Sequence, residues 1–502
     1  MAAMWRVGRL IAAPLAVMVV VGSAAPAAWA APEALVWGGC ERFAVDTSAI
    51  PTAQCGTVPV PVDWDNAAKP EGAQAQLAVI RVPATGEKVG ALMVNPGGPG
   101  ASAVDTVAGM AAALTDTEIR RRFDLVGFDP RGVGHSTPEL RCRTDAEFDA
   151  YRREPMADYS PAGVARIEQI YREFAQRCVD RMGPEFLANV GTASSARDID
   201  AVRAALGEDQ INYLGFSYGT ELGAAYAERF GDRVRAMVLD GAVDPSLDPI
   251  AETIRQMAGF QTAFNAYAAD CAQSAGCPLG TDPAQFVSRY HQLVDPLVQR
   301  PGITSDPRGL SYQDAITGTV SALYSQRFWK YLTSGLLGLQ RGTDAGDLLL
   351  LADDYQKRDA NGHYANRQDA FNAIRCVDSA YPTDPAVWAD ADRRIREVAP
   401  FLSYGSFTGS APRDVCAMWP VPPTSSPHPA SPGPGKVVVV STTGDPATPY
   451  QAGVDLARQL GAALITFEGT QHTVVFNGDA CVDTAVVRFL VDGVTPPNGL
   501  RC

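Results

Sequence analysis

Residues 211–219 read Ile-Asn-Tyr-Leu-Gly-Phe-Ser-Tyr-Gly, and this stretch decides the fold. The apolar run Ile211–Phe216 predicts a buried strand, and Tyr218–Phe230, rich in alanine, predicts a helix that follows it at once. Between them lies G-x-S-x-G, in which a sharp strand-to-helix turn lifts the serine hydroxyl above a sheet. Such a turn crowds the backbone, so only glycine fits on both sides. We therefore predict that Ser217 is a nucleophile, against the alternative of a serine in an ordinary tight turn.

Strands and helices alternate on both sides of this motif, a pattern typical of parallel βαβ units. Each predicted strand is short, apolar and bounded by turn residues. The other predicted strands are Thr57–Val62, Leu77–Val82, Ala91–Asn95, Phe123–Phe128, Val234–Leu239, Val437–Ser441 and Leu464–Phe467. The other predicted helices of this part are Ser195–Leu206, Tyr450–Leu460 and Val482–Leu490.

The alternation stops near Pro245 and resumes only after a proline-rich passage, Pro420–Pro434, which predicts a stiff linker. The chain between them shows mainly helical patterns, for example Phe286–Val298 and Tyr312–Tyr331. We therefore predict an α/β domain with a mostly parallel central sheet, built from residues 31–245 and 436–502. A helical cap with its linker, residues 246–435, is inserted between the strand ending near 239 and the strand starting near 437. The helical stretch 140–190 falls in the first part of the core.

The N-terminus predicts export. Arg6 and Arg9 precede the apolar run Leu10–Val21, and small residues lead to Ala28-Trp29-Ala30. This is the pattern of a signal peptide, residues 1–30, cleaved after about Ala30. The apolar run is shorter than the roughly 20 residues that cross a bilayer, which disfavours a membrane anchor. We expect a secreted or cell-wall-associated protein with no stable membrane insertion after cleavage.

The ten cysteines are an even number, and in an oxidising compartment they predict disulfides. They fall into close sequential couples, although spacing alone leaves the connectivity open. We expect Cys40–Cys55, Cys142–Cys178, Cys271–Cys277, Cys376–Cys416 and Cys481–Cys502. No C-x-x-C occurs and no histidine lies at ligand spacing from a cysteine, so neither a metal nor another cofactor is expected.

The formal net charge of −14 disfavours nucleic acid as a partner. A sequence of 502 residues that is 46% hydrophobic can bury a large core. The oligomeric state is left open, and a monomer is compatible with the sequence.

A serine nucleophile needs a base, and His472 is the predicted one among five histidines. The G-x-S-x-G fold has its triad in the chain order serine, acid, histidine. Only His472 lies after the serine and directly follows a late predicted strand. The others are His135, which precedes the serine, His291 in a helical pattern, His363 in a polar stretch and His428 in the linker.

The predicted acid is Asp445, in Gly444-Asp445-Pro446 after the strand Val437–Ser441. A carboxylate there would bond the second imidazole nitrogen and hold its tautomer. Aspartate in such a turn also serves turn formation alone. Asp240, one strand earlier, is the reserve candidate.

The loop Asn95-Pro-Gly-Gly-Pro-Gly predicts the donors for an oxyanion. We expect one N–H from Gly98 and one from Tyr218, the residue after the nucleophile. A phosphate-binding loop is the alternative, but no G-x-x-x-x-G-K-S/T is present. In Asp129-Pro-Arg-Gly-Val-Gly we expect Arg131 to pair with an acid and to serve structure.

These motifs, taken together, resemble the secreted tripeptidyl aminopeptidases of actinobacteria, relatives of the proline iminopeptidases. Val238-Leu-Asp-Gly-Ala-Val-Asp-Pro, Gly444-Asp-Pro-Ala-Thr-Pro, Gly469-Thr-Gln-His and the end region from about 376 add to the resemblance. It implies an α/β-hydrolase core with a helical cap, and release of short peptides, with tripeptides expected, from free N-termini without a metal. The family pattern His-Gly-Gly-Pro-Gly is replaced by Pro96-Gly-Gly-Pro-Gly, so proline specificity is not expected.

An aminopeptidase must recognise an ammonium group, and acids near Ser217 would do so. The candidates are Glu221, one helical turn beyond the serine, and Asp244 and Glu252 near the start of the cap. The same triad suits a carboxylesterase or lipase, and a catalytically silent binding protein is a third hypothesis.

Overall fold

The computed structural model describes residues 35–67, 72–431, 433 and 436–502 of the chain, so the predicted signal peptide lies outside the described residues. A nine-stranded sheet runs through the molecule in the order β1-β2-β4-β3-β5-β6-β7-β8-β9. The β1–β2 and β2–β4 pairs are antiparallel and all the others are parallel. The strands are β1 (Gln54–Pro61), β2 (Gln74–Val82), β3 (Gly90–Asn95), β4 (Phe123–Phe128), β5 (Ile211–Phe216), β6 (Val234–Asp240), β7 (Lys436–Thr442), β8 (Ala463–Phe467) and β9 (Leu500–Arg501).

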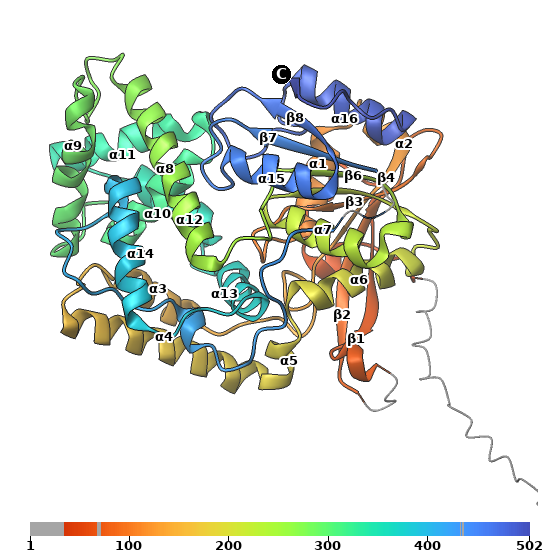
Figure 1. The fold of residues 1–502 in the computed structure, drawn as a ribbon, viewed down its shortest axis with the longest axis horizontal. Helices are drawn as coiled ribbons and strands as arrows, with labels where there is room; N and C mark the ends of the chain where they lie inside the picture. The colour runs from red at the N-terminus through yellow and green to blue at the C-terminus, as the bar shows by residue number, and fades with distance from the viewer. Residues whose placement is uncertain (1–34, 68–71, 432, 434–435) are drawn as a thin grey trace, which may run out of the picture.

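Helices cover both faces of the sheet, as the parallel strands require (Figure 1). α1 and α16 pack on one face, where Val107 and Phe489 meet Leu214 of β5 in one apolar cluster. α6, α7 and α15 pack on the other face, in a cluster that includes Leu222 and Met237. The bounds are α1 (Ala103–Ala113), α2 (Glu118–Arg122), α6 (Thr192–Ala205), α7 (Tyr218–Phe230), α15 (Tyr450–Leu460) and α16 (Ala480–Asp492).

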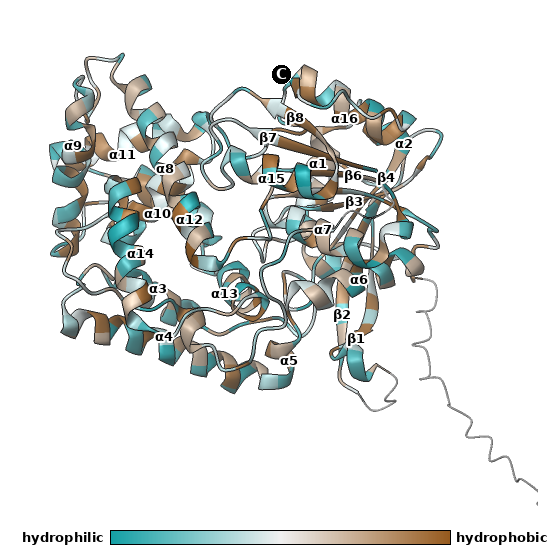
Figure 2. Cartoon of the chain, viewed as in Figure 1, coloured by the Kyte–Doolittle hydropathy of each residue, from teal (hydrophilic) through white to brown (hydrophobic). Residues whose placement is uncertain are grey.

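The central strands are apolar on both sides, because both faces are covered. β3 and β4 are buried along their whole length, and Figure 2 shows the hydrophobic colouring of the neighbouring strands β6 and β7. This pattern is why strand prediction from continuous apolar runs succeeds here.

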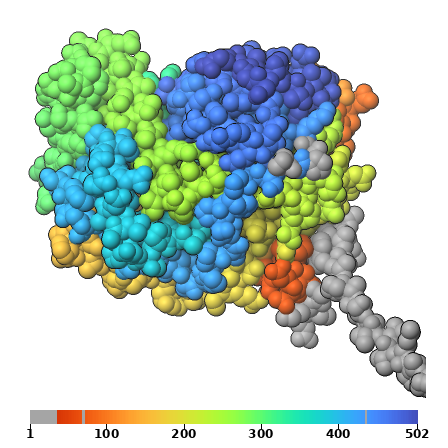
Figure 3. Space-filling view, viewed as in Figure 1, coloured from red at the N-terminus to blue at the C-terminus, as the bar shows by residue number. Residues whose placement is uncertain are grey.

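The cap lies beside the sheet domain and has its own apolar core, in which Phe264 stacks on Phe401 with ring centroids 4.5 Å apart. Its helices, on the left in Figure 1, lie directly against the C-terminal part of the core in Figure 3. They are α8 (Pro249–Cys271), α9 (Phe286–Val294), α10 (Tyr312–Leu323), α11 (Trp329–Arg341), α12 (Gly346–Gln356), α13 (Arg367–Asp378) and α14 (Pro385–Val398).

The stretch 140–190 forms α3 (Asp145–Arg153), α4 (Pro161–Met182) and α5 (Pro184–Ala188), and it runs beneath the cap rather than only beside the sheet (Figure 1). Buried Arg152 of α3 bonds to Asp314 of α10 at 2.7 Å and to Asp353 of α12 at 2.6 Å. Conversely, Ala373 of α13 joins the apolar cluster of the sheet domain. The described cap and core therefore exchange segments across the boundaries drawn from sequence.

Two predicted helices are wrong in their extent. The predicted helix Tyr312–Tyr331 is two helices, α10 and α11, separated by a break at Tyr324–Ser325. There the Tyr324 carbonyl accepts a hydrogen bond from the His472 amide at 2.9 Å, so tertiary contact ends the helix. The predicted helix Phe286–Val298 is α-helical only to Val294, because Pro296 has no N–H to continue it. Short strand β9 was not predicted.

All five predicted disulfides are confirmed, each joining sequential neighbours: Cys40–Cys55, Cys142–Cys178, Cys271–Cys277, Cys376–Cys416 and Cys481–Cys502. Such a set is typical of proteins of oxidising compartments. In the described part of the chain, no helix is both long and apolar enough to span a membrane.

Candidate active site

Ser217 occupies the turn between β5 and α7 and has a backbone φ of 55° and ψ of −128°. Positive φ is strained for a non-glycine residue, and strain of this kind is found at functional turns. The two flanking glycines are required by space: a Cβ on Gly215 would lie 2.3 Å from the Gly219 carbonyl oxygen, and one on Gly219 would lie 2.6 Å from the Asn95 oxygen. The Ser217 amide donates to the Asp240 carbonyl at 2.9 Å, which fastens the turn to β6.

The side chains of Asp445 and His472 contact each other at the carboxyl ends of β7 and β8. Both carboxylate oxygens of Asp445 lie 2.9 Å from Nδ1 of His472. Nδ1 therefore carries the proton and donates it, which leaves Nε2 as the basic nitrogen. Asp445 also accepts from the amides of Ala447 and Thr448, each at 2.9 Å, so it forms the turn and orients the imidazole at once.

His472 is basic for a buried imidazole. Burial alone would lower its pKa, but the charge and hydrogen bond of Asp445, with the charge of Asp240, raise the pKa above its ordinary value. Its ring is held edge-on by Tyr324 of the cap, at 5.3 Å between centroids. A residue of the cap thus contacts the imidazole directly, and the sequence did not indicate this contact.

Asp240, the reserve acid, supports the loop behind the imidazole. One oxygen accepts the amides of Val474 and Val475, both at 2.8 Å, and no hydrogen bond joins it to the His472 ring within the described residues. Burial raises the pKa of Asp240 to about 7, although the two amide bonds oppose this. The geometry thus assigns Asp445 to the imidazole and Asp240 to the loop that carries it.

Ser217 and His472 line one cavity of about 740 Å³ between the sheet domain and the cap. The described hydrogen bonds of the His472 ring are made by Nδ1, to Asp445 and Thr448, so Nε2 has no hydrogen bond to the Ser217 hydroxyl among the described residues. In unliganded enzymes such a bond is often long or poorly aligned and tightens when substrate binds.

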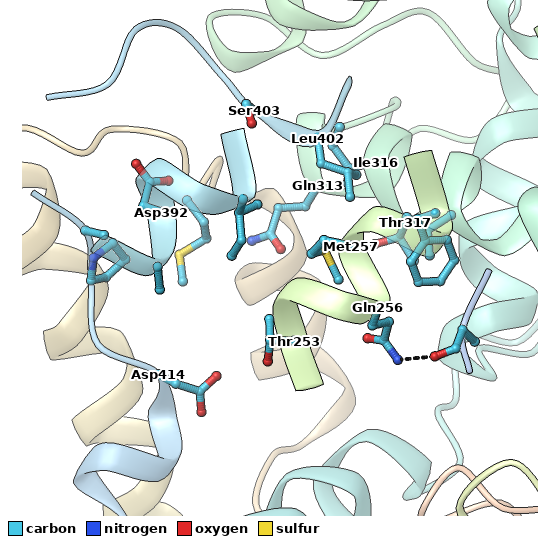
Figure 4. Close-up of a pocket in the computed structure, with 18 of the residues that line it drawn as sticks. Thr253, Gln256, Met257, Gln313, Ile316, Thr317, Asp392, Leu402, Ser403 and Asp414 are labelled. Atoms are coloured by element: carbon cyan, nitrogen blue, oxygen red, sulfur yellow. Dashed lines mark hydrogen bonds between the residues drawn. The ribbon is translucent and has the colours of Figure 1, made fainter. Parts of the chain in front are cut away.

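Cap side chains form most of the cavity wall (Figure 4). Thr253 and Met257 come from α8 and Ile316 from α10, and Leu402 follows α14. Gln256 is held by its bond to the Ala447 carbonyl at 2.9 Å, which ties α8 to the loop of Asp445. The wall is mixed, with aromatic and aliphatic groups beside a few polar ones, as in sites for small organic or peptide ligands.

The glycine-rich loop after β3 approaches the nucleophile turn closely. A Cβ on Gly97 would lie 2.3 Å from the Phe216 oxygen and 2.9 Å from the Tyr218 nitrogen, so glycine is required there. The Gly97 amide already donates to the Asn95 side chain at 2.9 Å. Gly98 lines the cavity beside Ser217, and Tyr218 begins α7, where an N–H has no acceptor within the helix. The structure therefore brings the two predicted donors, Gly98 and Tyr218, to the nucleophile.

An acidic residue, Glu221, lies one helical turn beyond the nucleophile, in the first turn of α7. Burial, followed by the charges of Asp378 and Glu252, raises the pKa of Glu221 well above its ordinary value. No hydrogen bond or cation reaches the Glu221 carboxyl among the described residues. Asp378, which the sequence did not single out, is bound to Thr192 at 2.7 Å through both oxygens, and Thr192 also bonds the Tyr218 hydroxyl. Glu221, Glu252 and Asp378 are called the acidic cluster below.

Asp244, the third candidate for amine binding, is occupied. Its carboxylate accepts from Ser246 and Gln459, at 2.6 and 2.9 Å, and pairs with Arg255 at 3.4 Å. Burial would raise its pKa, but these bonds lower it. Because its charge is already compensated, Asp244 differs from Glu221, which has no such partner among the described residues.

Arg131 serves structure, as expected. Its guanidinium is fully buried and binds both oxygens of Asp198, at 2.8 and 2.6 Å. The remaining histidines bond to carboxylates elsewhere and do not line the cavity: His135 to Asp105, His291 to Asp295, His363 to Asp145 and His428 to Glu228.

Comparison with known proteins places the chain in a family. The alpha/beta hydrolase fold family matches residues 90–479. "Carboxylesterase B" of Mycobacterium tuberculosis is 70% identical over 467 residues, which cover 93% of this chain and 89% of that protein. "Serine protease Hip1" of the same organism is 56% identical over 475 residues, 93% of this chain and 90% of that one. "Tripeptidyl aminopeptidase" of Streptomyces lividans is 33% identical over 509 residues, 96% of this chain and 89% of that one.

These similarities agree with the geometry of a serine on a strand–helix turn, an imidazole with a free nitrogen in the same cavity, and a carboxylate behind it. The chain therefore belongs to the α/β-hydrolase fold family, among the serine hydrolases that resemble the actinobacterial tripeptidyl aminopeptidases.

Proposed function

We propose that the protein is a secreted serine exopeptidase that releases short peptides, mainly tripeptides, from free N-termini. Ser217, His472 and Asp445 form its catalytic triad. The observation that carries the peptidase proposal is the acidic cluster. Glu221 lies one helical turn beyond Ser217 and has no cationic partner among the described residues. The negative charges of Asp378 and Glu252 raise its pKa further.

The reaction proceeds through an acyl-enzyme. Rotation of the Ser217 side chain brings its hydroxyl to Nε2 of His472, which takes the proton as the oxygen attacks the scissile carbonyl. The amides of Gly98 and Tyr218 stabilise the oxyanion, and removal of one such donor typically costs about 10²–10³ in rate. The His472 imidazolium, stabilised by Asp445, then protonates the leaving amine. Water, activated by the same imidazole, hydrolyses the ester and frees Ser217.

The acidic cluster gives a physical reason for exopeptidase action. Carboxyls whose pKa is raised by burial and by like charges gain when a cation enters among them. The α-ammonium of a substrate is such a cation, and a blocked N-terminus is not. The cap forms most of the wall of the cavity of Ser217 and limits how much peptide fits there, which favours short products.

A carboxylesterase is the second candidate function. The relative named "Carboxylesterase B" is 70% identical, and the same triad and oxyanion donors cleave esters. The apolar side chains of the cavity wall, Met257, Ile316 and Leu402 among them, would accept an acyl chain.

Matched substrates separate the two. Tetrapeptides with free and N-acetylated termini, and acyl esters of similar size, are compared by kcat/KM with the oxidised protein. The peptidase proposal expects the free peptides to be cleaved and the acetylated ones to be cleaved at least 100-fold less well. Fast ester cleavage with no peptide turnover contradicts it. Ser217→Ala is the control for contaminating activity, and Glu221→Gln should lose selectively the preference for free amines.

A fluorophosphonate probe tests the hypothesis of a silent binding protein. Covalent labelling of wild type and none of Ser217→Ala is expected. Secretion is tested separately, by N-terminal sequencing of protein recovered from culture medium, where a start at residue 31 is expected.

A further inference from the structure

Three arginines line the catalytic cavity, and Arg367 differs from the other two. Arg396 pairs with Asp392 at 2.7 Å, and Arg413 pairs with Glu168 at 2.7 Å. In the described part of the chain, no carboxylate or other hydrogen-bond acceptor contacts the guanidinium of Arg367. It is thus a cavity-lining cation whose charge the protein itself leaves uncompensated.

The backbone of Arg367 is fixed beside the oxyanion loop. Arg367 is the first residue of α13, and a Cβ on Gly100 would lie 2.6 Å from its carbonyl oxygen. The preceding residue, Asn366, donates to the Gly132 carbonyl at 2.7 Å and accepts from the Gly134 amide at 3.1 Å. A cation attached at this point therefore has a defined place relative to Gly98 and Ser217.

Aromatic rings connect this guanidinium with the imidazole. Arg367 lies over the ring of Tyr355, 5.4 Å from its centroid, and Tyr355 lies 6.0 Å from Tyr324, which contacts His472 at 5.3 Å. Burial raises the pKa of Tyr324 well above its ordinary value, although the charge of Arg367 opposes this, so the hydroxyl stays protonated. The contact with Tyr355 positions the Arg367 guanidinium, but an aromatic face does not replace the hydrogen-bond acceptors that its N–H groups need.

The physics of this position favours an anion. A guanidinium offers five N–H donors, and a planar carboxylate can accept two of them in parallel. The positive end of the helix dipole of α13 adds to the attraction, and it makes a cation at this helix end unfavourable for stability alone. The nearby phenol of Tyr324 cannot compensate the charge because it is neutral.

We infer that the Arg367 guanidinium binds a carboxylate of the substrate inside the catalytic cavity. The inference rests on the proposed hydrolytic function of Ser217 and extends it to substrate selection. Two sources of the carboxylate have the same chemistry: an acidic side chain, or the free C-terminus of a short peptide. With the acidic cluster holding the ammonium, the second source would make the cavity a site for whole short peptides with both ends charged.

Matched peptides distinguish the two sources. One pair carries a free or an amidated C-terminus, and further pairs exchange aspartate for asparagine at one position at a time. Wild type is expected to favour one carboxylate class by 10-fold or more in kcat/KM. Arg367→Gln should bring that ratio to within 2-fold of unity, and Arg367→Lys, which keeps the charge, should restore part of the ratio. Arg341→Gln, which removes an exposed cation outside the cavity lining, is the matched control and should leave the ratio unchanged.

A second arm keeps this inference separate from the peptidase proposal. If no peptide is cleaved, the 4-nitrophenyl monoester of glutaric acid is compared with 4-nitrophenyl butyrate, and the same loss of carboxylate preference is expected in Arg367→Gln. Calorimetry on Ser217→Ala, with and without Arg367→Gln, measures binding of the favoured peptide directly and should show at least a 10-fold weaker Kd for the double variant. A wild type that does not discriminate, or a preference that survives Arg367→Gln, overturns the inference and leaves Arg367 as a stacking wall of the cavity.

Discussion

Asp445 contacts Nδ1 of His472 with both carboxylate oxygens at 2.9 Å, whereas Asp240, one strand away, binds only backbone amides of the same loop. The two acids therefore have different partners, although Asp240 ends β6 and Asp445 lies in the turn that follows the neighbouring strand β7. Asp445 faces the imidazole, and Asp240 holds the loop on which the imidazole is carried.

Exchange of each acid for its amide tests this division. Asp445→Asn should reverse the preferred imidazole tautomer and lower kcat by about 10⁴-fold. Asp240→Asn retains an oxygen that accepts the Val474 and Val475 amides, so kcat should stay within about 10-fold of wild type. Both are measured by steady-state kinetics on one substrate. A larger loss in Asp240→Asn than in Asp445→Asn would reverse the assignment.

The same Asp240→Asn variant should change how stability depends on pH. The pKa of Asp240 is about 7 in the folded protein, against 3.8 for the ordinary group, because burial favours the protonated form. The folded state thus binds the proton more tightly, and wild-type stability falls as pH rises from about 4 to 7. The free energy of unfolding of Asp240→Asn, relative to that of wild type, should therefore increase by at least about 1.4 kcal/mol as pH rises from about 4 to 7. Denaturant unfolding at pH 4.5 and 7.5 measures the difference, and an equal effect at both values contradicts it.

The pH dependence of kcat/KM should report two groups in opposite directions. His472 must be neutral to act as a base, and its pKa is raised by Asp445 and Asp240 against the effect of burial, so activity should rise through a midpoint above that of an ordinary histidine. A substrate with a free α-amino group should lose activity again above a pH of about 8, where the ammonium deprotonates. An ester without an amine should show the rise only. A fall at high pH with both substrates would point to a group of the protein instead.

Gly97 offers a test of the close approach between the oxyanion loop and the nucleophile. Gly97→Ala would place a Cβ 2.3 Å from the Phe216 oxygen at a residue with a φ of +83°, so the loop must move away from Tyr218. We expect kcat to fall by about 10²-fold or more, the cost of a lost oxyanion donor. Gly109→Ala is the control, because nothing lies within 4 Å of its Cβ and it is inside helix α1. This variant should keep full activity and gain about 0.5–1 kcal/mol of stability.

Arg131 should matter for stability and not for chemistry. Arg131→Met leaves the fully buried Asp198 without its ion partner, which typically costs about 3–5 kcal/mol. Thermal unfolding should show the loss, and active-site titration with a fluorophosphonate should show normal reactivity per folded molecule. Reduced reactivity in a fully folded Arg131→Met protein would mean that the loop 129–136 acts on the site directly.

Sequence reasoning succeeded where one local pattern determines the structure. The strand β5 and the helix α7 were predicted to the residue, because the apolar run and the G-x-S-x-G turn act together. The order serine, acid, histidine also selected Asp445 and His472, since parallel strands bring their carboxyl ends to one edge. The roles of these residues in catalysis remain predictions.

Other features depend on contacts between distant segments and could not be read locally. The helix break at Tyr324 exists because the carbonyl of that residue binds the His472 amide. Asp378 approaches Glu221 through the packing of α13 against α6, whose Thr192 bonds both Asp378 and Tyr218. Asp244 remained a candidate for amine binding because its partner Gln459 is more than two hundred residues away in the sequence. Periodicity within one segment carries no information on such partners.

The five disulfides close loops of 6 to 40 residues in strict succession, and none encloses or crosses another. A chain that enters an oxidising compartment N-terminus first would therefore present the two halves of each bridge before the next begins. An oxidase that joins cysteines in their order of arrival would make the native set, without the reshuffling that interleaved bridges demand. The two remote parts of the sheet could then meet after their covalent links are complete.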